Sequence, residues 1–171
     1  MSKRLPQKVK CCLKKALDSA LLAIETYNKP AVKFKSGGFI VLMCIAWTSL
    51  FHAIFFKRKI APLYKEGKRL TRVNGELQFW ELQKCAKKYF YEQPSPIQRN
   101  IEFFIHLRNK IEHKFLPEID ANIFAECQAF LLNFDKIVEK EFGDKYCLRE
   151  SLSFALQLFP SSKTLSMSVK K

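Results

Sequence analysis

The segment from Gly37 to Phe56 constrains the fold most, because it carries no charged residue over about the 20 residues that a helix needs to cross a membrane. Such a segment suits either a membrane span or the central helix of a bundle, which is apolar on all sides when other helices cover it. Thr48, Ser49 and His52 fall on one side of this helix, and the sequence contains no second segment of this kind. We therefore predict the buried central helix of a bundle and keep a membrane span as the alternative.

Composition favours a single all-α domain. The 171 residues are 48% hydrophobic and include 5 glycines and 7 prolines, which is enough apolar material for one sizeable core. The 16 phenylalanines accompany long runs of leucine, lysine, alanine and glutamate, and few segments alternate strictly between apolar and polar residues. We predict one helical domain over residues 1–159 and a flexible tail over residues 160–171.

Helix boundaries follow from the spacing of apolar residues and from capping residues. The predicted helices span residues 6–27, 38–57, 77–91, 96–116, 121–142 and 145–159. Ser95 is the expected N-cap of the fourth helix, Asp120 is that of the fifth, and Gly143 is expected to end the fifth. His52, on the apolar second helix, is expected to be a hydrogen-bonded core histidine.

Positive charge is concentrated in the first half of the chain. Residues 1–90 hold 19 lysines and arginines against 5 acids, whereas residues 91–171 hold 11 against 11, and the formal net charge is +14. Turn signals and alternating residues between 57 and 77 predict a small basic β-hairpin or loop inserted into the helical fold. Clustered cations favour RNA or an anionic membrane surface as a partner, although a solubilising surface explains them equally well. The cations expected to contact a nucleic acid there are Lys57, Arg58, Lys68, Arg69 and Arg72.

The six cysteines, at positions 11, 12, 44, 85, 127 and 147, form no CxxC pair. The three histidines have no cysteine neighbour at the distances that zinc fingers or ribbons use. The basic N-terminus lacks the apolar core of a secretory signal. We therefore predict reduced and mostly buried thiols, no structural metal, no cofactor and a cytoplasmic location.

The helix predicted over residues 96–116 contains the stretch IEFFIHLRNKIEHKF, which places an arginine, an asparagine and two histidines among apolar residues. At about 100° per residue, Arg108 is expected on the buried stripe, where Glu112 one turn later can pair with it. This ion pair is the structural explanation of the motif. The residues that share this face are Phe104, Ile105, Arg108, Glu112 and Phe115.

His106, Asn109 and His113 form a second stripe on the flank of the same helix, and this stripe allows a catalytic explanation. Histidine gives and takes protons near neutral pH, and arginine is the cation best shaped for a phosphate. These two groups suffice to cleave RNA without a metal, because the ribose 2′-hydroxyl is the nucleophile and the enzyme only moves protons and neutralises charge. A solvent-exposed edge without function is the other explanation.

Arg108 and Asn109, followed by His113, resemble the signature of the HEPN superfamily of helical-bundle ribonucleases and toxins. The segments ALLAIETYNKP, FIVLMCIAWTSLFHA, FFIHLRNKIEHK and ECQAFLLNF resemble, in that order, a HEPN-like family of bacterial proteins. This resemblance covers roughly residues 13 to 158. It implies a bundle of four to five helices, a homodimer with a composite active site, and metal-independent cleavage of RNA to a 2′,3′-cyclic phosphate.

By position, the resemblance implies that Arg108 stabilises the scissile phosphate, that His113 transfers protons, and that Asn109 orients the histidine or the RNA. His106 and Lys110 are expected to contact the substrate at the border of the site. A role as a toxin or in defence against phage, with an antitoxin or another regulatory partner, follows from the same resemblance. The alternative function is a non-catalytic module that binds RNA or a nucleotide in the same cleft.

Two features bear on how such a site would work. HEPN toxins that are paired with a nucleotidyltransferase antitoxin usually carry a tyrosine two residues after the histidine, and Phe115 stands there in this chain. Control by modification of that tyrosine is therefore not expected. On an unbroken helix Arg108 and His113 point about 140° apart, so they cannot both face one phosphate squarely. A local bend, the long reach of Arg108 or a second subunit resolves this conflict, and we expect the second subunit.

Overall fold

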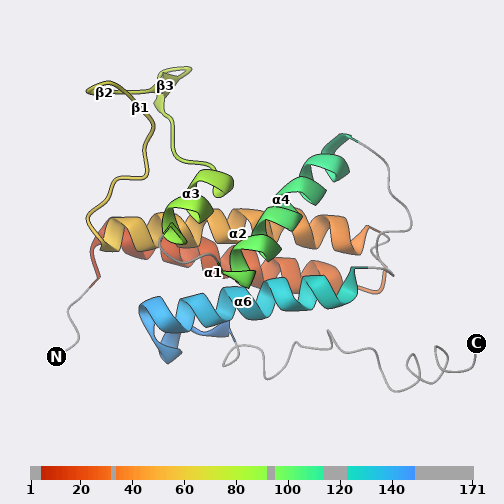
Figure 1. Cartoon of the computed structure of the whole chain (residues 1–171). Helices are drawn as coiled ribbons and strands as arrows, with labels where there is room; N and C mark the ends of the chain where they lie inside the picture. The colour runs from red at the N-terminus through yellow and green to blue at the C-terminus, as the bar shows by residue number, and fades with distance from the viewer. Residues whose placement is uncertain (1–4, 32–33, 92–94, 114–122, 149–171) are drawn as a thin grey trace, which may run out of the picture.

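The computed structural model describes residues 5–31, 34–91, 95–113 and 123–148, and within these ranges the fold is an all-α bundle with a small β insertion (Figure 1). Apolar residues at helical spacing form its helices, as the sequence predicts. A short 3-10 turn, η1 (Asp144–Tyr146), follows the last of them. The helices are α1 (Gln7–Asn28), α2 (Lys35–Lys57), α3 (Leu82–Tyr89), α4 (Pro96–His113) and α6 (Phe124–Phe142).

Helix α2 is the centre of the bundle, as predicted from its lack of charge. It packs against α1, α3, α4 and α6, and its contact with α1 is the most extensive in the described part of the chain. Among the described helices α2 is long and apolar enough to cross a membrane, and 67% of its most apolar window is buried inside the bundle. Covering helices on several sides account for a helix that is apolar all round.

Aromatic rings join α2, α4 and α6 in the core. The ring of Phe104 from α4 stacks on that of Phe130 from α6 with a centroid distance of 4.2 Å. Trp47 from α2 stacks on Phe130 with a centroid distance of 5.8 Å and meets Phe134 edge-on at 5.4 Å. All four side chains are fully buried. This cluster fixes the position of α4, which carries the arginine and histidine motif.

The β insertion consists of two small hairpins rather than the single hairpin that the sequence predicts. A bridge between Leu63 and Phe79 closes its base. The central Thr71 donates its N–H to the Tyr64 carbonyl and accepts from the Gln78 N–H, which holds the two hairpins together. Figure 1 shows this arm projecting from the helical bundle. Its strands are β1 (Lys65–Glu66) paired with β2 (Arg69–Leu70), and β3 (Arg72–Val73) paired with β4 (Glu76–Leu77).

The pairing in the arm also explains why α3 begins at Leu82 instead of Leu77. Leu77 belongs to β4, and the Gln78 and Trp80 amides donate to the carbonyls of Thr71 and Pro62. The Gln78 carbonyl also accepts from the Tyr64 N–H, so this segment keeps the backbone pairing of the arm as far as Trp80. Helix propensity in this segment is overridden by the hairpin pairing.

The remaining boundaries follow the predictions with local differences. Ser95 caps α4, since its hydroxyl oxygen accepts from the Ile97 N–H at 3.2 Å, and Gly143 ends α6 with a φ of 92°. Helix α2 starts at Lys35, three residues early, and the Phe34 ring packs against Gly37, where a Cβ atom would clash with it. The last predicted helix does not start at residue 145, since η1 occupies its first turn.

Several predictions fall on residues that the structure does not describe. The N-cap at Asp120 and the position of Phe115 lie within residues 114–122. The remainder of the helix predicted over 145–159 and the tail over 160–171 lie within residues 149–171. These expectations stay predictions.

Candidate functional site

The arginine and histidine motif lies in the C-terminal half of α4. Ile101, Phe104 and Ile105 are buried and hold the first part of this helix in the bundle. The last two turns carry polar side chains, and most of these are exposed. The motif is therefore presented to solvent from a helix whose position the core fixes.

Arg108 has two neighbours that hold its guanidinium. Its Nε lies 3.6 Å from Oε1 of Glu112, which confirms the ion pair predicted from the i,i+4 spacing. Nη2 and Nε also donate to Oδ1 of Asn109 at 2.9 and 3.3 Å. The Arg108 side chain is 34% exposed, so it lies at the edge of the apolar stripe rather than on the buried stripe. A partly exposed guanidinium held from two sides can reach an anion outside the helix.

Asn109 therefore orients the arginine, whereas the resemblance implied that it orients the histidine or the RNA. Its amide oxygen accepts twice from Arg108, because adjacent long and short side chains can meet at the solvent-facing edge of a helix. His113 is exposed, and in the described part of the chain its imidazole has no hydrogen-bond partner. His106 and Lys110 are exposed beside it. One subunit thus offers a positioned arginine and an unsupported histidine.

The Cys44 thiol of α2 lies near the motif. Burial raises the pKa of the Cys44 thiol on α2 to about 12, and the charges of Arg108 and Glu112 act on the same thiol with opposite signs. Cys44 is thus a neutral thiol at physiological pH. Cys44 therefore adds no charge to the motif.

The cations predicted to bind nucleic acid separate into two groups. Arg58 pairs with Glu141 of α6, with Nη2 to Oε1 at 2.6 Å, and Lys57 donates to the Glu141 carbonyl. The Tyr89 hydroxyl donates to the same Glu141 carboxylate at 2.8 Å. These two cations fasten the end of α2 to the end of α6 and do not belong to the arm. The sequence did not predict these contacts, because Glu141 lies about 80 residues from Lys57 and Arg58 in the chain.

The other group lies on the β arm. Lys68 and Arg69 are exposed at its tip, and Arg72 donates from Nη1 to the Gly75 carbonyl at 2.7 Å. Figure 1 shows the arm and the C-terminal end of α4 both extending beyond the central helices, at separate places on the bundle. The structure therefore keeps the arm cations apart from Arg108 and His113.

His52 is a half-buried histidine with a partner, as predicted. Its Nε2 lies 2.8 Å from the Trp80 carbonyl oxygen. Burial lowers the pKa of His52, an effect that the bond to Trp80 opposes. A neutral ring that donates to a backbone carbonyl has a structural task, which sets His52 apart from the motif.

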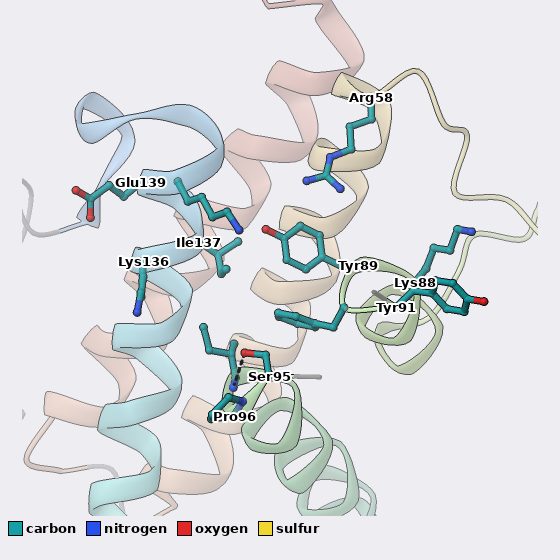
Figure 2. A pocket seen from close by; sticks show the side chains of 12 residues that line it. Arg58, Lys88, Tyr89, Tyr91, Ser95, Pro96, Lys136, Ile137 and Glu139 are labelled. Atoms are coloured by element: carbon teal, nitrogen blue, oxygen red, sulfur yellow. Dashed lines mark hydrogen bonds between the residues drawn. The ribbon is translucent and has the colours of Figure 1, made fainter. Parts of the chain in front are cut away.

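A cavity of about 920 Å³ lies at the other end of α4 and was not predicted. It opens between the end of α3, the start of α4 and the C-terminal half of α6 (Figure 2). The spacing of Lys136 and Lys140 by one helical turn was the available signal, but the sequence does not show which helices face them. The lining residues are Arg58, Lys88, Tyr89, Phe90, Tyr91, Ser95, Pro96, Ile97, Lys136, Ile137, Glu139 and Lys140.

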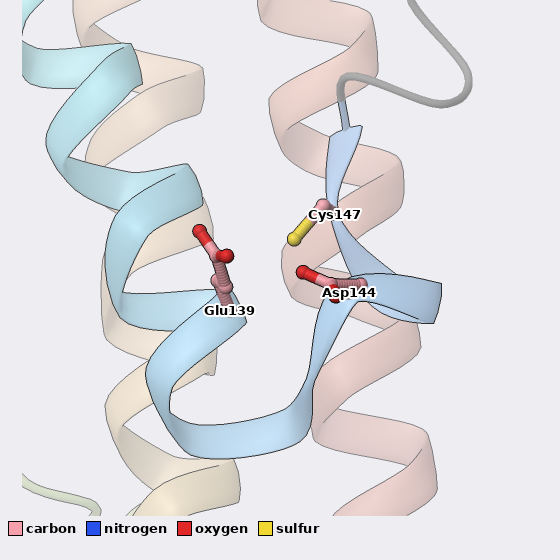
Figure 3. Close-up of side chains that lie close together, drawn as sticks. All are labelled: Glu139, Asp144 and Cys147. Carbon is pink, nitrogen blue, oxygen red and sulfur yellow. The ribbon is translucent and has the colours of Figure 1, made fainter.

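Glu139, in the last turn of α6, forms a cluster with Asp144 and Cys147, which follow the helix, and Figure 3 shows the three together. One potential metal-ligand atom from each lies within 4.8 Å of the others. Glu139 and Asp144 are exposed, and Cys147 is buried. Each of these three residues also interacts with another group of the protein. Exposed acids of this kind commonly occur without a metal, so the cluster is not assigned a ligand.

The chain belongs to the family described as Domain of unknown function (DUF3644), whose model matches residues 11–171. Comparison with curated proteins found no match, and comparison with solved structures found none either. The family description names no activity. The function therefore rests on the residues and on the resemblance of their motif.

Proposed function

We propose that this protein is a metal-independent RNA endonuclease of the HEPN type. Arg108, Asn109 and His113 form its site. The observation that carries the proposal is the guanidinium of Arg108, which Glu112 and Asn109 hold at the edge of an exposed helix end. These two contacts hold the guanidinium in one place while leaving it partly exposed to an anion.

The chemistry divides between the two side chains. The imidazole of His113 removes the proton of the ribose 2′-hydroxyl or returns one to the leaving 5′-oxygen. The guanidinium of Arg108 neutralises charge that builds on the phosphoryl oxygens during attack. The P–O bond to the 5′-oxygen breaks as the 2′-oxygen bonds to phosphorus, which leaves a 2′,3′-cyclic phosphate and a 5′-hydroxyl.

A homodimer supports this chemistry better than one subunit. Arg108 and His113 point about 140° apart around α4, and His113 has no orienting partner within the described residues. Two copies of the motif that meet across a two-fold axis place the histidine of one subunit near the arginine of the other. Sedimentation tests this point, because a monomer that cleaves RNA at its working concentration contradicts it.

The exposed arm guides the RNA toward the site. Lys68, Arg69 and Arg72 offer charge at a distance from the motif, and such contacts displace counterions from phosphates. RNA binding should therefore weaken steeply as salt is raised. An enzyme that uses the 2′-hydroxyl of the RNA as the nucleophile suits a toxin or a phage-defence protein. Such a protein would act in the cytoplasm under the control of a regulatory partner.

The decisive experiment incubates the purified full chain with total cellular RNA in EDTA and maps the new ends. Cyclic-phosphate ends are expected from the wild type. Arg108→Ala and His113→Ala are expected to abolish them, whereas Arg99→Ala, an exposed arginine on the same helix, is expected to cleave normally. Cleavage that persists in both motif variants refutes the assignment.

A second candidate function is a module that binds RNA without cutting it. The observation in its favour is that Asn109 holds Arg108 and leaves His113 without support. This module would keep the phosphate contact of Arg108 and lack proton transfer. Salt-sensitive RNA binding that Arg108→Ala weakens, without cyclic-phosphate ends, favours this candidate.

A further inference from the structure

The cavity at the start of α4 is separate from the motif. Pro96 lines it, and His113 ends the same helix 17 residues later, which corresponds to about 25 Å at 1.5 Å per residue. Its walls come from α3, α4 and α6. A ligand in this cavity therefore does not touch the proposed cleavage site.

The cavity lining has an excess of positive charge, because Arg58, Lys88, Lys136 and Lys140 line it against one acid, Glu139. Lys136 and Lys140 lie one turn apart on α6, and Lys88 is at the end of α3. In the ranges that the structure covers, no carboxylate pairs with any of these three lysines. Two lysines at i and i+4 repel each other, so an anion between them relieves an unfavourable contact.

The carboxylates near the cavity, those of Glu139 and Glu141, interact with other groups of the protein. Glu141 is bound to Arg58 and to the Tyr89 hydroxyl. Figure 2 shows Glu139 directed away from Tyr89, toward the far side of α6, where it joins Asp144. The charge of Arg58 is thus matched by Glu141, and the three lysines remain for an incoming anion.

Part of the lining is aromatic and apolar. Tyr89 and Phe90 form an aromatic wall in which the two rings meet edge-on with a centroid distance of 4.8 Å, and Ile97 of α4 and Ile137 of α6 add apolar surface. The bond to Glu141 fixes the Tyr89 hydroxyl. The first turn of α4, which contains no acidic residue, borders the same space and adds the positive end of its helix dipole. The cavity therefore presents an anionic subsite beside an apolar one.

From this pairing we propose that the cavity binds a nucleoside di- or triphosphate, with its phosphates at Lys136 and Lys140 and its base against the aromatic wall. The volume lies within the range of about 300–1,000 Å³ that is usual for small-molecule sites. A flat groove would suit a nucleic-acid strand better, whereas this site is bounded by three helices. The proposed RNA cleavage does not depend on this ligand.

The test is calorimetric titration of the full-length protein with ATP, GTP, inorganic triphosphate and adenosine. ATP or GTP is expected to bind, triphosphate to compete more weakly, and adenosine alone to bind least. The double variant Lys136→Glu/Lys140→Glu is expected to weaken binding by about tenfold or more per lysine. The matched control is Lys29→Glu/Lys87→Glu, which reverses two exposed lysines outside the cavity and has the same net charge.

The outcomes separate the alternatives. Loss of nucleotide binding in the cavity variant, with wild-type binding in the control, supports the proposal. Equal weakening in both variants means that nucleotides bind the basic protein non-specifically, and it overturns the proposal. Binding of a short single-stranded RNA through Lys136 and Lys140 without nucleotide binding also overturns it. Because RNA cleavage is not the readout, a negative result leaves the proposed ribonuclease function standing.

Discussion

Replacing Arg108 by alanine separates a functional from a structural arginine. If Arg108 only stabilises α4, its removal should lower the free energy of unfolding by the full contribution of its contacts with Glu112 and Asn109. If it stabilises a scissile phosphate, cleavage should disappear while stability changes little. Phe104→Ala, on the same helix one turn earlier, is the reference for a structural loss.

The contacts of Arg108 bound its contribution to stability. Its ion pair with Glu112 joins side chains that are 34% and 49% exposed, and such i,i+4 pairs contribute about 0.3–0.5 kcal/mol. The hydrogen bonds to Asn109 are exposed and add about 0.5–1 kcal/mol. The loss is therefore about 0.8–1.5 kcal/mol, or about 2–6 °C in Tm for a chain of this size.

Phe104 gives the contrast. It is fully buried and stacks on Phe130 at 4.2 Å, and truncation of such a ring costs about 3–5 kcal/mol, or about 6–20 °C. Thermal melting by circular dichroism and cyclic-phosphate mapping on the same samples measure both quantities. Melting of Arg108→Ala as low as that of Phe104→Ala would contradict a functional role for Arg108, and so would normal melting together with continued cleavage of RNA.

The remaining predictions concern groups outside the motif. Because burial lowers the pKa of His52, its protonation favours the unfolded chain, so Tm should fall as pH drops below about 6.5, and His52→Gln should flatten this dependence. Glu141→Gln should cost about 1–3 kcal/mol in urea unfolding, because Arg58 loses its counter-charge at a carboxylate that is 9% exposed. Iodoacetamide should label the exposed Cys11 and spare the native Cys44, whose pKa is raised to about 12; mass spectrometry that finds equal labelling contradicts the buried position.

Local sequence patterns predicted the helices well because their causes are local. The uncharged segment that forms α2 has no alternative but burial or a membrane, and the structure surrounds it with helices. The caps at Ser95 and Gly143 follow from the side-chain hydroxyl of serine and the positive φ that glycine permits. The ion pair between Arg108 and Glu112 follows from helical spacing alone.

The predictions were wrong where residues distant in the sequence determine the local structure. Leu77 has helical neighbours in sequence, but it pairs with Arg72 in the arm, and the amides that follow it are used there. Lys57 and Arg58 look like part of a basic patch, but Glu141 binds both of them from a helix far along the chain. A run of charged residues predicts a solvent-exposed surface. The sequence does not show that the tertiary fold brings an acidic residue against that run.

The geometry of Asn109 constrains how the proposed site could be completed. A protonated imidazole can only donate hydrogen bonds, so its stabilisation requires an acceptor. The amide oxygen of Asn109 already accepts twice from Arg108, which occupies both of its lone pairs, and its amide nitrogen can only donate. Asn109 therefore cannot stabilise the charged form of His113 while it holds Arg108. Within the described residues no acceptor contacts the His113 imidazole, so the proposed chemistry takes this acceptor from the substrate phosphate or from a second subunit.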